Sequence, residues 1–342
     1  MALRILAIEP GPAFSVADVH AGWVKAFRQL GCHVVNFNMA DRLDFYCGAH
    51  LEKEGQFVRA FNEEAAIRLA AKGVEAAALE VWPDLVLVTS GFFIPPAVYE
   101  LLRIRGFKIV LNHLEEPYEA TREMARAALV DANVINDPTH LESFRAVNPN
   151  TWYLPAAHDP EIHHPGASVA DLTCDFGFVG TGFDSRIRFF EAVDWDGIDV
   201  ALAGNWAETD EDSPLRKFVV HDLAECFPND RTADLYRSAK VSANLYRREA
   251  QNPGLERGWA MGPREVELAA CGTFFLRDPR EEGNEVLPML PTFTGPADFE
   301  DQLRWWLDRD QARRDAAEAA RAAVQDRTFV ENAKALLRLL AT

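Results

Sequence analysis

The chain has 342 residues, a formal net charge of −18 and 48% hydrophobic residues. This length suggests about two domains, and the composition argues against disorder over most of the chain. The acidic balance disfavours nonspecific binding to nucleic acid or to an anionic membrane surface. No run of about 18 uncharged apolar residues occurs, so we expect no membrane span.

The five cysteines are odd in number and widely spaced, and they include no C-x-x-C pair. Such cysteines are typical of proteins in a reducing compartment. Residues 1–10 run directly into an apolar stretch, without the basic region and small-residue cleavage site of a secretion signal. We therefore expect a cytoplasmic protein.

Six short apolar runs alternate with helix-length segments in the first half of the chain. They cover residues 3–8, 33–37, 84–88, 107–111, 132–135 and 152–154. Residues 19–30 form a helix-like segment closed by Gly31, and residues 57–80 are the longest helix candidate. This alternation predicts a parallel sheet with helices on both faces and with ligands at the carboxyl ends of the strands.

Residues 154–165, LPAAHDPEIHHP, contain three prolines and no periodic pattern, which indicates an interdomain linker. Six more runs follow, at residues 175–179, 199–203, 217–221, 240–244, 273–276 and 292–294, before a polar helical region at 301–324 and an amphipathic helix at 330–340. We expect two doubly wound Rossmann-like α/β domains, residues 1–157 and 158–328, facing across a cleft. Residues 329–342 should return to the first domain.

Two domains of this kind admit several functions. The loop after the first strand, residues 9–14, EPGPAF, lacks the G-x-G-x-x-G spacing of a dinucleotide-binding turn. The glycine loop at residues 177–182, GFVGTG, has no suitably placed acidic residue about 20 positions later, because Asp199 opens a strand. No G-K-[ST] sequence of a Walker loop occurs. These observations argue against an NAD(P) oxidoreductase and against a P-loop enzyme.

Residues 262–278, GPREVELAACGTFFLRD, combine a helix start, two polar residues on one helical face and a glycine stop. Pro263 suits the first turn and Gly272 ends the helix. Arg264 and Glu267 are three residues apart and share a face. A helix start favours phosphate, an arginine can bind phosphate oxygens, and a carboxylate can accept hydrogen bonds from both ribose hydroxyls. The segment predicts a nucleotide-sugar site, with a plain Arg/Glu surface pair as the alternative.

Four ordered motifs span about half of the chain. They are YLPAAHDP at residues 153–160, DFGFVGTGFDSR at 175–186, YRSAKVSAN at 236–244 and REVELAACG at 264–272. Together they resemble the motifs of the CgeB-like (spore-maturation-protein-like) glycosyltransferases of the GT-B group. The first domain matches more loosely: NHLEEP, residues 112–117, stands where relatives carry an aspartate two residues before a proline, and Glu115 is its counterpart.

The resemblance implies a metal-independent hexosyltransferase that moves a sugar from a nucleoside-diphosphate donor to an acceptor hydroxyl held by the first domain. Glu267 would hold the donor ribose, and Arg264 and Lys240 would lie near the diphosphate. Gly180 and Gly182 would let the diphosphate approach the first loop. The remaining residues expected at the donor site are Arg186, Tyr236, Asn244 and Gly262.

The string Asp194-Trp195-Asp196 spells D-x-D, which other glycosyltransferases use to bind a divalent metal. Here it precedes a strand that starts near Ile198, without a matching nucleotide fold, so we expect no metal site and no cofactor. Many retaining relatives carry a glutamate eight residues before the ribose-binding one, but that position is Trp259 here. The stereochemistry therefore stays open, as do the sugar, the nucleotide, the acceptor (protein, glycan, small molecule or modified nucleic acid) and the oligomeric state.

A base on the acceptor side should lie at the strand ends of the first domain. His20 and Asp18 follow the first strand, and His113 and Glu115 follow the fourth. Any of them could accept a proton from a hydroxyl. We expect Glu115 to do so, with Glu116 facing the other way because adjacent side chains of an extended segment point to opposite sides.

Two other functions fit the same architecture. A nucleotide-sugar 2-epimerase would need several acid/base residues but no acceptor, and would form product from the donor alone. A catalytically silent nucleotide-sugar-binding scaffold would bind tightly without turnover.

Overall fold

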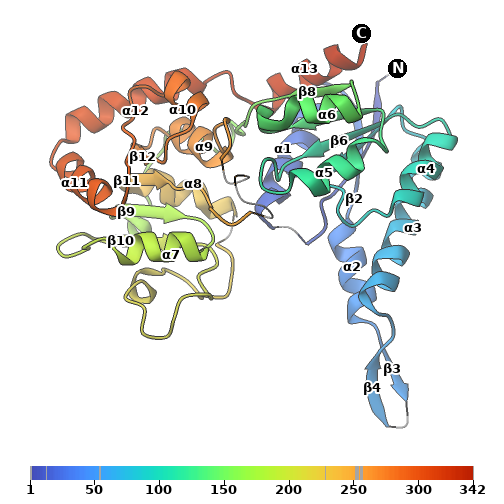
Figure 1. The fold of residues 1–342 in the computed structure, drawn as a ribbon, viewed down its shortest axis with the longest axis horizontal. Coiled ribbons are helices and arrows are strands. Elements are labelled where there is room, and N and C mark those ends of the chain that lie inside the picture. The colour runs from blue at the N-terminus through green and yellow to red at the C-terminus, as the bar shows by residue number, and fades with distance from the viewer. Residues whose placement is uncertain are drawn as a thin grey trace. The chain divides into compact units, whose positions relative to one another are not determined.

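A computed structural model describes residues 2–12, 14–53, 55–227, 229–250, 254 and 257–341 (Figure 1). The chain forms two compact units. Unit 1 contains Met1–Leu154 and Asn332–Thr342, and unit 2 contains Pro155–Glu331. Among the described helices, none combines the length and the apolar character needed to cross a membrane.

Unit 1 is built on a six-stranded parallel sheet with the strand order β2-β1-β5-β6-β7-β8. Its strands are β1 (Arg4–Ile8), β2 (His33–Phe37), β5 (Leu85–Thr89), β6 (Ile109–His113), β7 (Ala132–Ile135) and β8 (Thr151–Tyr153). All six lie at or within two residues of the predicted runs. The prediction of a parallel sheet in this half is confirmed, and the carboxyl ends of β1, β5, β6 and β7 therefore meet at one edge.

The helices of unit 1 are α1 (Phe14–Gln29), α2 (Met39–Gly48), α3 (Glu63–Val81), α4 (Pro96–Ile104), α5 (Ala120–Ala127) and α6 (Leu141–Val147), with a 3-10 turn η1 (Pro138–His140). Helix α13 (Phe329–Ala341) belongs to unit 1 from Asn332 onward. Alternate strand residues such as Leu6, Val86 and Leu111 pack in one core with α3 and α4. The Lys108 ammonium donates to the carbonyl of Leu340 in α13 at 3.0 Å.

The longest helix starts later than predicted. Within residues 57–80, the first part belongs to an antiparallel hairpin of β3 (His50–Lys53) and β4 (Gln56–Arg59). Asn62 then caps α3 by accepting a hydrogen bond from the amide of Ala65. The hairpin lies beyond the ends of α2 and α3, away from the sheet of unit 1 (Figure 1).

Unit 2 contains a four-stranded parallel sheet, with the order β10-β9-β11-β12. Its strands are β9 (Cys174–Val179), β10 (Val200–Ala203), β11 (Ala239–Asn244) and β12 (Phe275–Arg277). The strands predicted at residues 217–221 and 292–294 are wrong. Val219 and Thr292 each make a single bridge, to Leu202 and Arg277, at the two edges of the sheet. These edge segments are too short and too irregular to extend the ladder.

The helices of unit 2 are α7 (Asp184–Glu191), α8 (Asn229–Ser238), α9 (Pro263–Cys271), α10 (Glu281–Val286), α11 (Pro296–Leu307) and α12 (Asp310–Val324), with 3-10 turns η2 (Ala170–Leu172) and η3 (Arg216–Phe218). The helical region predicted at residues 301–324 is thus split between α11 and α12. Phe176 and Phe178 of β9 pack with Phe190 and Phe299 in an aromatic core beneath this sheet.

Candidate functional site

Helix α9 has the predicted boundaries. Gly262 precedes it, Pro263 is its first residue, and Gly272 ends it with φ of 74°. The fully buried Glu265, which the sequence reading did not single out, accepts a hydrogen bond from the Gly262 amide at 3.1 Å and another from the Tyr246 hydroxyl. The helix start is therefore capped from within the protein. A glutamate at the third helical position is the sequence signal that could have revealed this cap.

The side chain of Arg264 lies at the carboxyl ends of β9 and β11. Its Nη1 donates to Oδ1 of Asn244, the last residue of β11, at 3.0 Å. Its guanidinium carbon stands 5.0 Å from the centre of the Phe178 ring. A Cβ atom added at Gly180 would lie only 2.6 Å from Arg264 Nη2, so the absence of a side chain at Gly180 makes room for this arginine.

A second arginine lies against the same glycine. The buried Arg186 of α7 donates from Nε to the carbonyl of Leu245 and from Nη1 to the carbonyl of Thr181, both at 3.0 Å. Its guanidinium carbon is 5.6 Å from the Phe178 ring centre, and its Nη1 would be 3.2 Å from a Cβ at Gly180. Two cationic groups therefore converge beside Gly180, at the sheet edge where parallel α/β domains bind ligands.

Glu267 lies one helical turn beyond Arg264 on α9. The hydroxyl of the buried Tyr236 is 3.5 Å from its Oε2. Burial raises the pKa of Glu267 to about 7, against the opposing effects of Arg264 and Tyr236. We call Gly180, Arg186, Arg264 and Glu267 the donor cluster. Within it, the positive charge of two guanidinium groups lies beside a carboxylate with spare acceptor capacity.

Two buried donors at this edge have no hydrogen-bond partner among the described residues: Asn244 Nδ2 and Arg264 Nε. Unpaired buried donors are rare in folded proteins and cost about 1–3 kcal/mol each. A ligand oxygen at the edge of β11 would satisfy such groups.

The structure does not bring every predicted donor residue to this cluster. Lys240 lies at the amino end of β11, the opposite end from Asn244, and its ammonium pairs with Asp175 at 2.7 Å. Gly182 packs against the indole ring of Trp206. A Cβ at this position would lie only 2.6 Å from that ring. The absence of a side chain at Gly182 is thus explained by core packing.

The D-x-D string also has structural partners. Arg304 of α11 pairs with Asp194 at 3.8 Å, and the Trp195 indole donates to the carbonyl of Phe190 at 2.8 Å. Among the described residues, no group of three or more His, Cys, Asp or Glu side chains is arranged to hold a metal ion.

The acceptor-side candidates lie in unit 1. His20 of α1 is buried, with Nδ1 2.8 Å from Thr89 Oγ1 and Nε2 2.7 Å from Asn36 Oδ1. Burial lowers the pKa of His20. Asp18 is exposed on the same helix. Both ring nitrogens of His20 are therefore engaged within the protein.

His113, the last residue of β6, is fully buried. Its Nε2 is 2.9 Å from Asn133 Oδ1, and its Nδ1 is 3.8 Å from Oε1 of the equally buried Glu123. Burial lowers the pKa of His113 to about 4, and burial raises the pKa of Glu123 well above its ordinary value. Glu123 Oε1 also accepts hydrogen bonds from the amides of Leu114 and Glu115, at 3.1 and 3.0 Å. The side chains of His113 and Glu123 are therefore buried together at this part of the edge.

Glu115 and Glu116 differ in burial. Glu115 is half-buried, whereas Glu116 is 3% exposed and its Oε1 is hydrogen-bonded to Nδ1 of His140. Burial and the nearby Asp137 carboxylate raise the pKa of Glu116 to about 8. The sequence reading missed His140, because only the pairing of β6 with β7 brings it beside Glu116.

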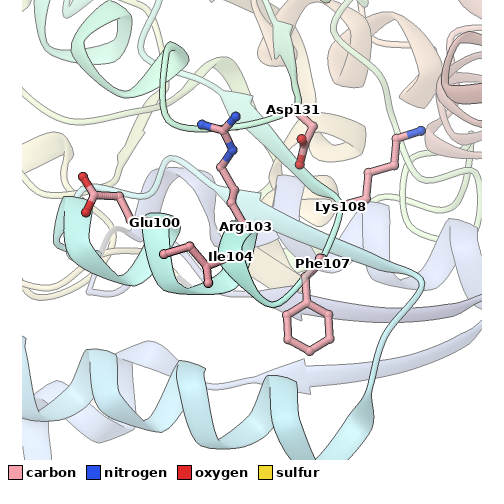
Figure 2. Close-up of a pocket in the computed structure, with 7 residues that line it drawn as sticks. Glu100, Arg103, Ile104, Phe107, Lys108 and Asp131 are labelled. Atoms are coloured by element: carbon pink, nitrogen blue, oxygen red, sulfur yellow. The ribbon is translucent and has the colours of Figure 1, made fainter.

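An open depression of about 710 Å³ lies at the other end of the unit 1 sheet. Its lining comes from α4 and from the loops that enter β6 and β7, including Arg103, Lys108 and Asp131 (Figure 2). Asp131 accepts a hydrogen bond from the amide of Ile109 at 2.7 Å. These side chains are at the amino ends of the strands and so lie apart from all the predicted site residues of unit 1.

Comparison with solved structures identifies the class of fold. Over 99% of both chains, the protein is similar to a sucrose-phosphate synthase from Thermosynechococcus elongatus, with 14% identity and a TM-score of 0.66. It is also similar to a glycosyltransferase from Rickettsia africae, with 12% identity and a TM-score of 0.63 over 99% of this chain and 98% of that one. A putative UDP-N-acetylglucosamine 2-epimerase from Listeria monocytogenes is similar with 13% identity and a TM-score of 0.63, over 99% of this chain and 96% of that one. The fold is GT-B.

The family comparison is consistent with this class. Residues 186–338 match the model of a family described as glycosyl transferase-like. The match includes Arg186, Arg264 and Glu267 of the donor cluster. A comparison with curated proteins finds no match.

Proposed function

We propose that the protein is a glycosyltransferase that moves a sugar from a nucleoside-diphosphate donor to an acceptor hydroxyl. The observation that carries this proposal is the convergence of Arg186 and Arg264 on Gly180, with Glu267 one turn further along α9. The two guanidinium groups suit a diphosphate, and the carboxylate suits the paired hydroxyls of a ribose. The glycosyl transferase-like match of residues 186–338 supports the same class of reaction.

In this proposal, the donor cluster stabilises the leaving diphosphate and no ion is required. Positive charge that is already fixed in place lowers the barrier without reorganisation during the reaction. Activity should therefore persist in EDTA. Loss of activity that manganese or magnesium restores would direct attention back to Asp194 and Asp196. The acceptor hydroxyl is assigned to groups of unit 1, where Glu115 is the base predicted from sequence.

A thermal-shift screen with UDP-glucose, UDP-N-acetylglucosamine, GDP-mannose and their nucleoside diphosphates tests donor binding, because a ligand that binds the native state raises the melting temperature. Following the bound donor by phosphorus NMR then tests turnover. Release of nucleoside diphosphate is the expected result. No shift with any donor would contradict the proposal.

A 2-epimerase is the second candidate. Its support is the set of titratable groups at the strand ends of unit 1, which are the buried His113, Glu116 and Glu123 and the partly exposed His140. The phosphorus NMR assay separates the two functions. An epimerase converts the donor alone into a second nucleotide sugar, whereas a transferase releases nucleoside diphosphate. Tight binding without either reaction would indicate a silent scaffold.

A further inference from the structure

A carboxylate–imidazole pair lies at the carboxyl edge of the unit 1 sheet. Glu116 follows β6, and His140 ends the turn η1 that follows β7. His113 and Ile135, the last residues of these two strands, are register partners, so the segments beyond them leave the sheet side by side. Oε1 of Glu116 is hydrogen-bonded to Nδ1 of His140 across 24 residues of sequence.

The two members of the pair differ in their access to solvent. The Glu116 side chain is wholly buried, while the His140 side chain is 26% exposed. Within the described part of the chain, the His140 ring makes no other hydrogen bond, so its Nε2 is open to an incoming group. A buried carboxylate that holds one ring nitrogen fixes the direction in which the other nitrogen points.

The surroundings of the pair favour its protonated form at neutral pH. Burial and the Asp137 carboxylate raise the pKa of Glu116 to about 8. Two other titratable groups interact with the Glu116 carboxyl: His140 on η1, by a hydrogen bond, and Glu123 on α5, by charge repulsion. Glu115 also repels Glu123. Among the described residues, no arginine or lysine forms an ion pair with Glu116. Loss of one proton leaves an ionised Glu116 that accepts from His140 Nδ1–H, with a lone pair on Nε2.

We propose that His140, oriented by Glu116, is the base that takes the proton from the acceptor hydroxyl. This inference rests on the glycosyl transfer proposed above. The hydroxyl oxygen forms a bond to the anomeric carbon while the bond from that carbon to the diphosphate oxygen breaks. The hydroxyl proton moves to His140 Nε2, and the electron pair leaves with the diphosphate. The resulting imidazolium is stabilised by the Glu116 carboxylate.

His140 is a better-placed base than the residues predicted from sequence. His20 and His113 have their ring nitrogens enclosed by Thr89, Asn36, Asn133 and Glu123. Glu115 is only half-buried. The carboxylate that is hydrogen-bonded to the His140 ring belongs to Glu116. The proposal therefore reverses the roles expected for Glu115 and Glu116.

The first test observes the pair itself and needs no substrate. Nitrogen NMR of the full chain above a pH of about 8, where Glu116 is ionised, should show the His140 proton on Nδ1, with His140→Gln used to assign the signal. In Glu116→Ala, which removes the acceptor of that proton, the ring should shift toward the Nε2–H form. The same tautomer in the parent and in Glu116→Ala would overturn the inference, whether or not the protein is a transferase.

The second test measures turnover, as release of nucleoside diphosphate from whichever of UDP-glucose, UDP-N-acetylglucosamine or GDP-mannose the parent binds, with water as the acceptor. His140→Gln should lose about 10²–10⁴ in rate while donor affinity is retained. Glu116→Gln should also lose rate and lose the rise of the pH–rate profile toward about 8. Glu115→Gln should lose far less. Glu142→Gln, on the exposed side of α6, should match the parent.

The outcomes separate the two claims. Normal turnover by His140→Gln would overturn the base assignment and leave the transferase proposal intact. An absence of turnover by the parent with every donor would overturn both. For each variant, calorimetry of donor binding and the melting temperature test whether the protein is still folded. A variant with normal values and reduced turnover has lost catalysis and not its fold.

Discussion

Removing the guanidinium of Arg264 should weaken binding of a nucleoside-diphosphate sugar while leaving the fold in place. The Arg264 side chain donates to Asn244, and its buried Nε has no hydrogen-bond partner among the described residues. A charge-assisted hydrogen bond contributes about 1.5–3 kcal/mol, so Arg264→Ala should raise Kd by about 10- to 150-fold. Titration calorimetry with UDP-glucose, or with another donor that the thermal-shift screen identifies, measures this change directly.

Lys240→Ala is the matched control for Arg264→Ala. It removes the same charge from the same unit, but at the amino end of β11, where Lys240 pairs with Asp175. Its donor affinity should equal that of the parent within error at moderate salt, because exposed charges more than about 10 Å away are screened. Unchanged affinity in Arg264→Ala, or an equal loss in Lys240→Ala, would refute the assignment of the diphosphate to the carboxyl ends of the strands.

Three further predictions concern single side chains. Gly180→Ala should reduce donor affinity without unfolding unit 2, because the added Cβ would lie 2.6 Å from Arg264 Nη2; calorimetry and melting temperature test this, and normal affinity would contradict it. Since the pKa of Glu267 is about 7 and only its ionised form accepts from both ribose hydroxyls, affinity for UDP-glucose should fall as pH decreases from about 8 to about 6, and should be weaker and flat in Glu267→Gln. Equal pH dependence in both proteins would be the contrary result. The pKa of Glu116 is raised, so its contribution to stability is fully present below the ordinary value of 4.5 and is lost as pH rises through about 8. The free energy of unfolding of the parent should therefore fall by a few kcal/mol over this range relative to Glu116→Gln in denaturant titrations, and parallel pH curves would refute the buried placement.

Local sequence signals predicted much of the fold. The unit 1 strands follow from apolar runs bounded by turn residues, and α9 follows from Pro263 at its start and Gly272 at its end. Residues 217–221, KFVVH, and residues 292–294, TFT, also favour a strand by composition. Whether such an edge segment forms a full ladder depends on its neighbour, which the sequence does not display. Residues 57–59 are not part of the predicted helix, because they pair with residues 50–52.

The site was predictable where its residues are close in sequence. Arg264 and Glu267 share a helix, so their common face follows from spacing alone. Gly182 could not be interpreted in this way, because its packing partner Trp206 comes from another loop. Glu116 and His140 meet only because β6 and β7 are adjacent in the sheet. For Lys240, the predicted strand at residues 240–244 was sufficient. A residue at the start of a strand lies away from the carboxyl end, where ligands bind, so its place outside the donor cluster could have been predicted.

A crystal structure of the protein with bound UDP would show whether the donor cluster binds the diphosphate. We expect the diphosphate beside Gly180, in contact with the guanidinium groups of Arg186 and Arg264, and the ribose hydroxyls within hydrogen-bond distance of Glu267. A nucleotide bound elsewhere on the chain, or one bound here without contact to Arg264 and Glu267, would contradict this expectation.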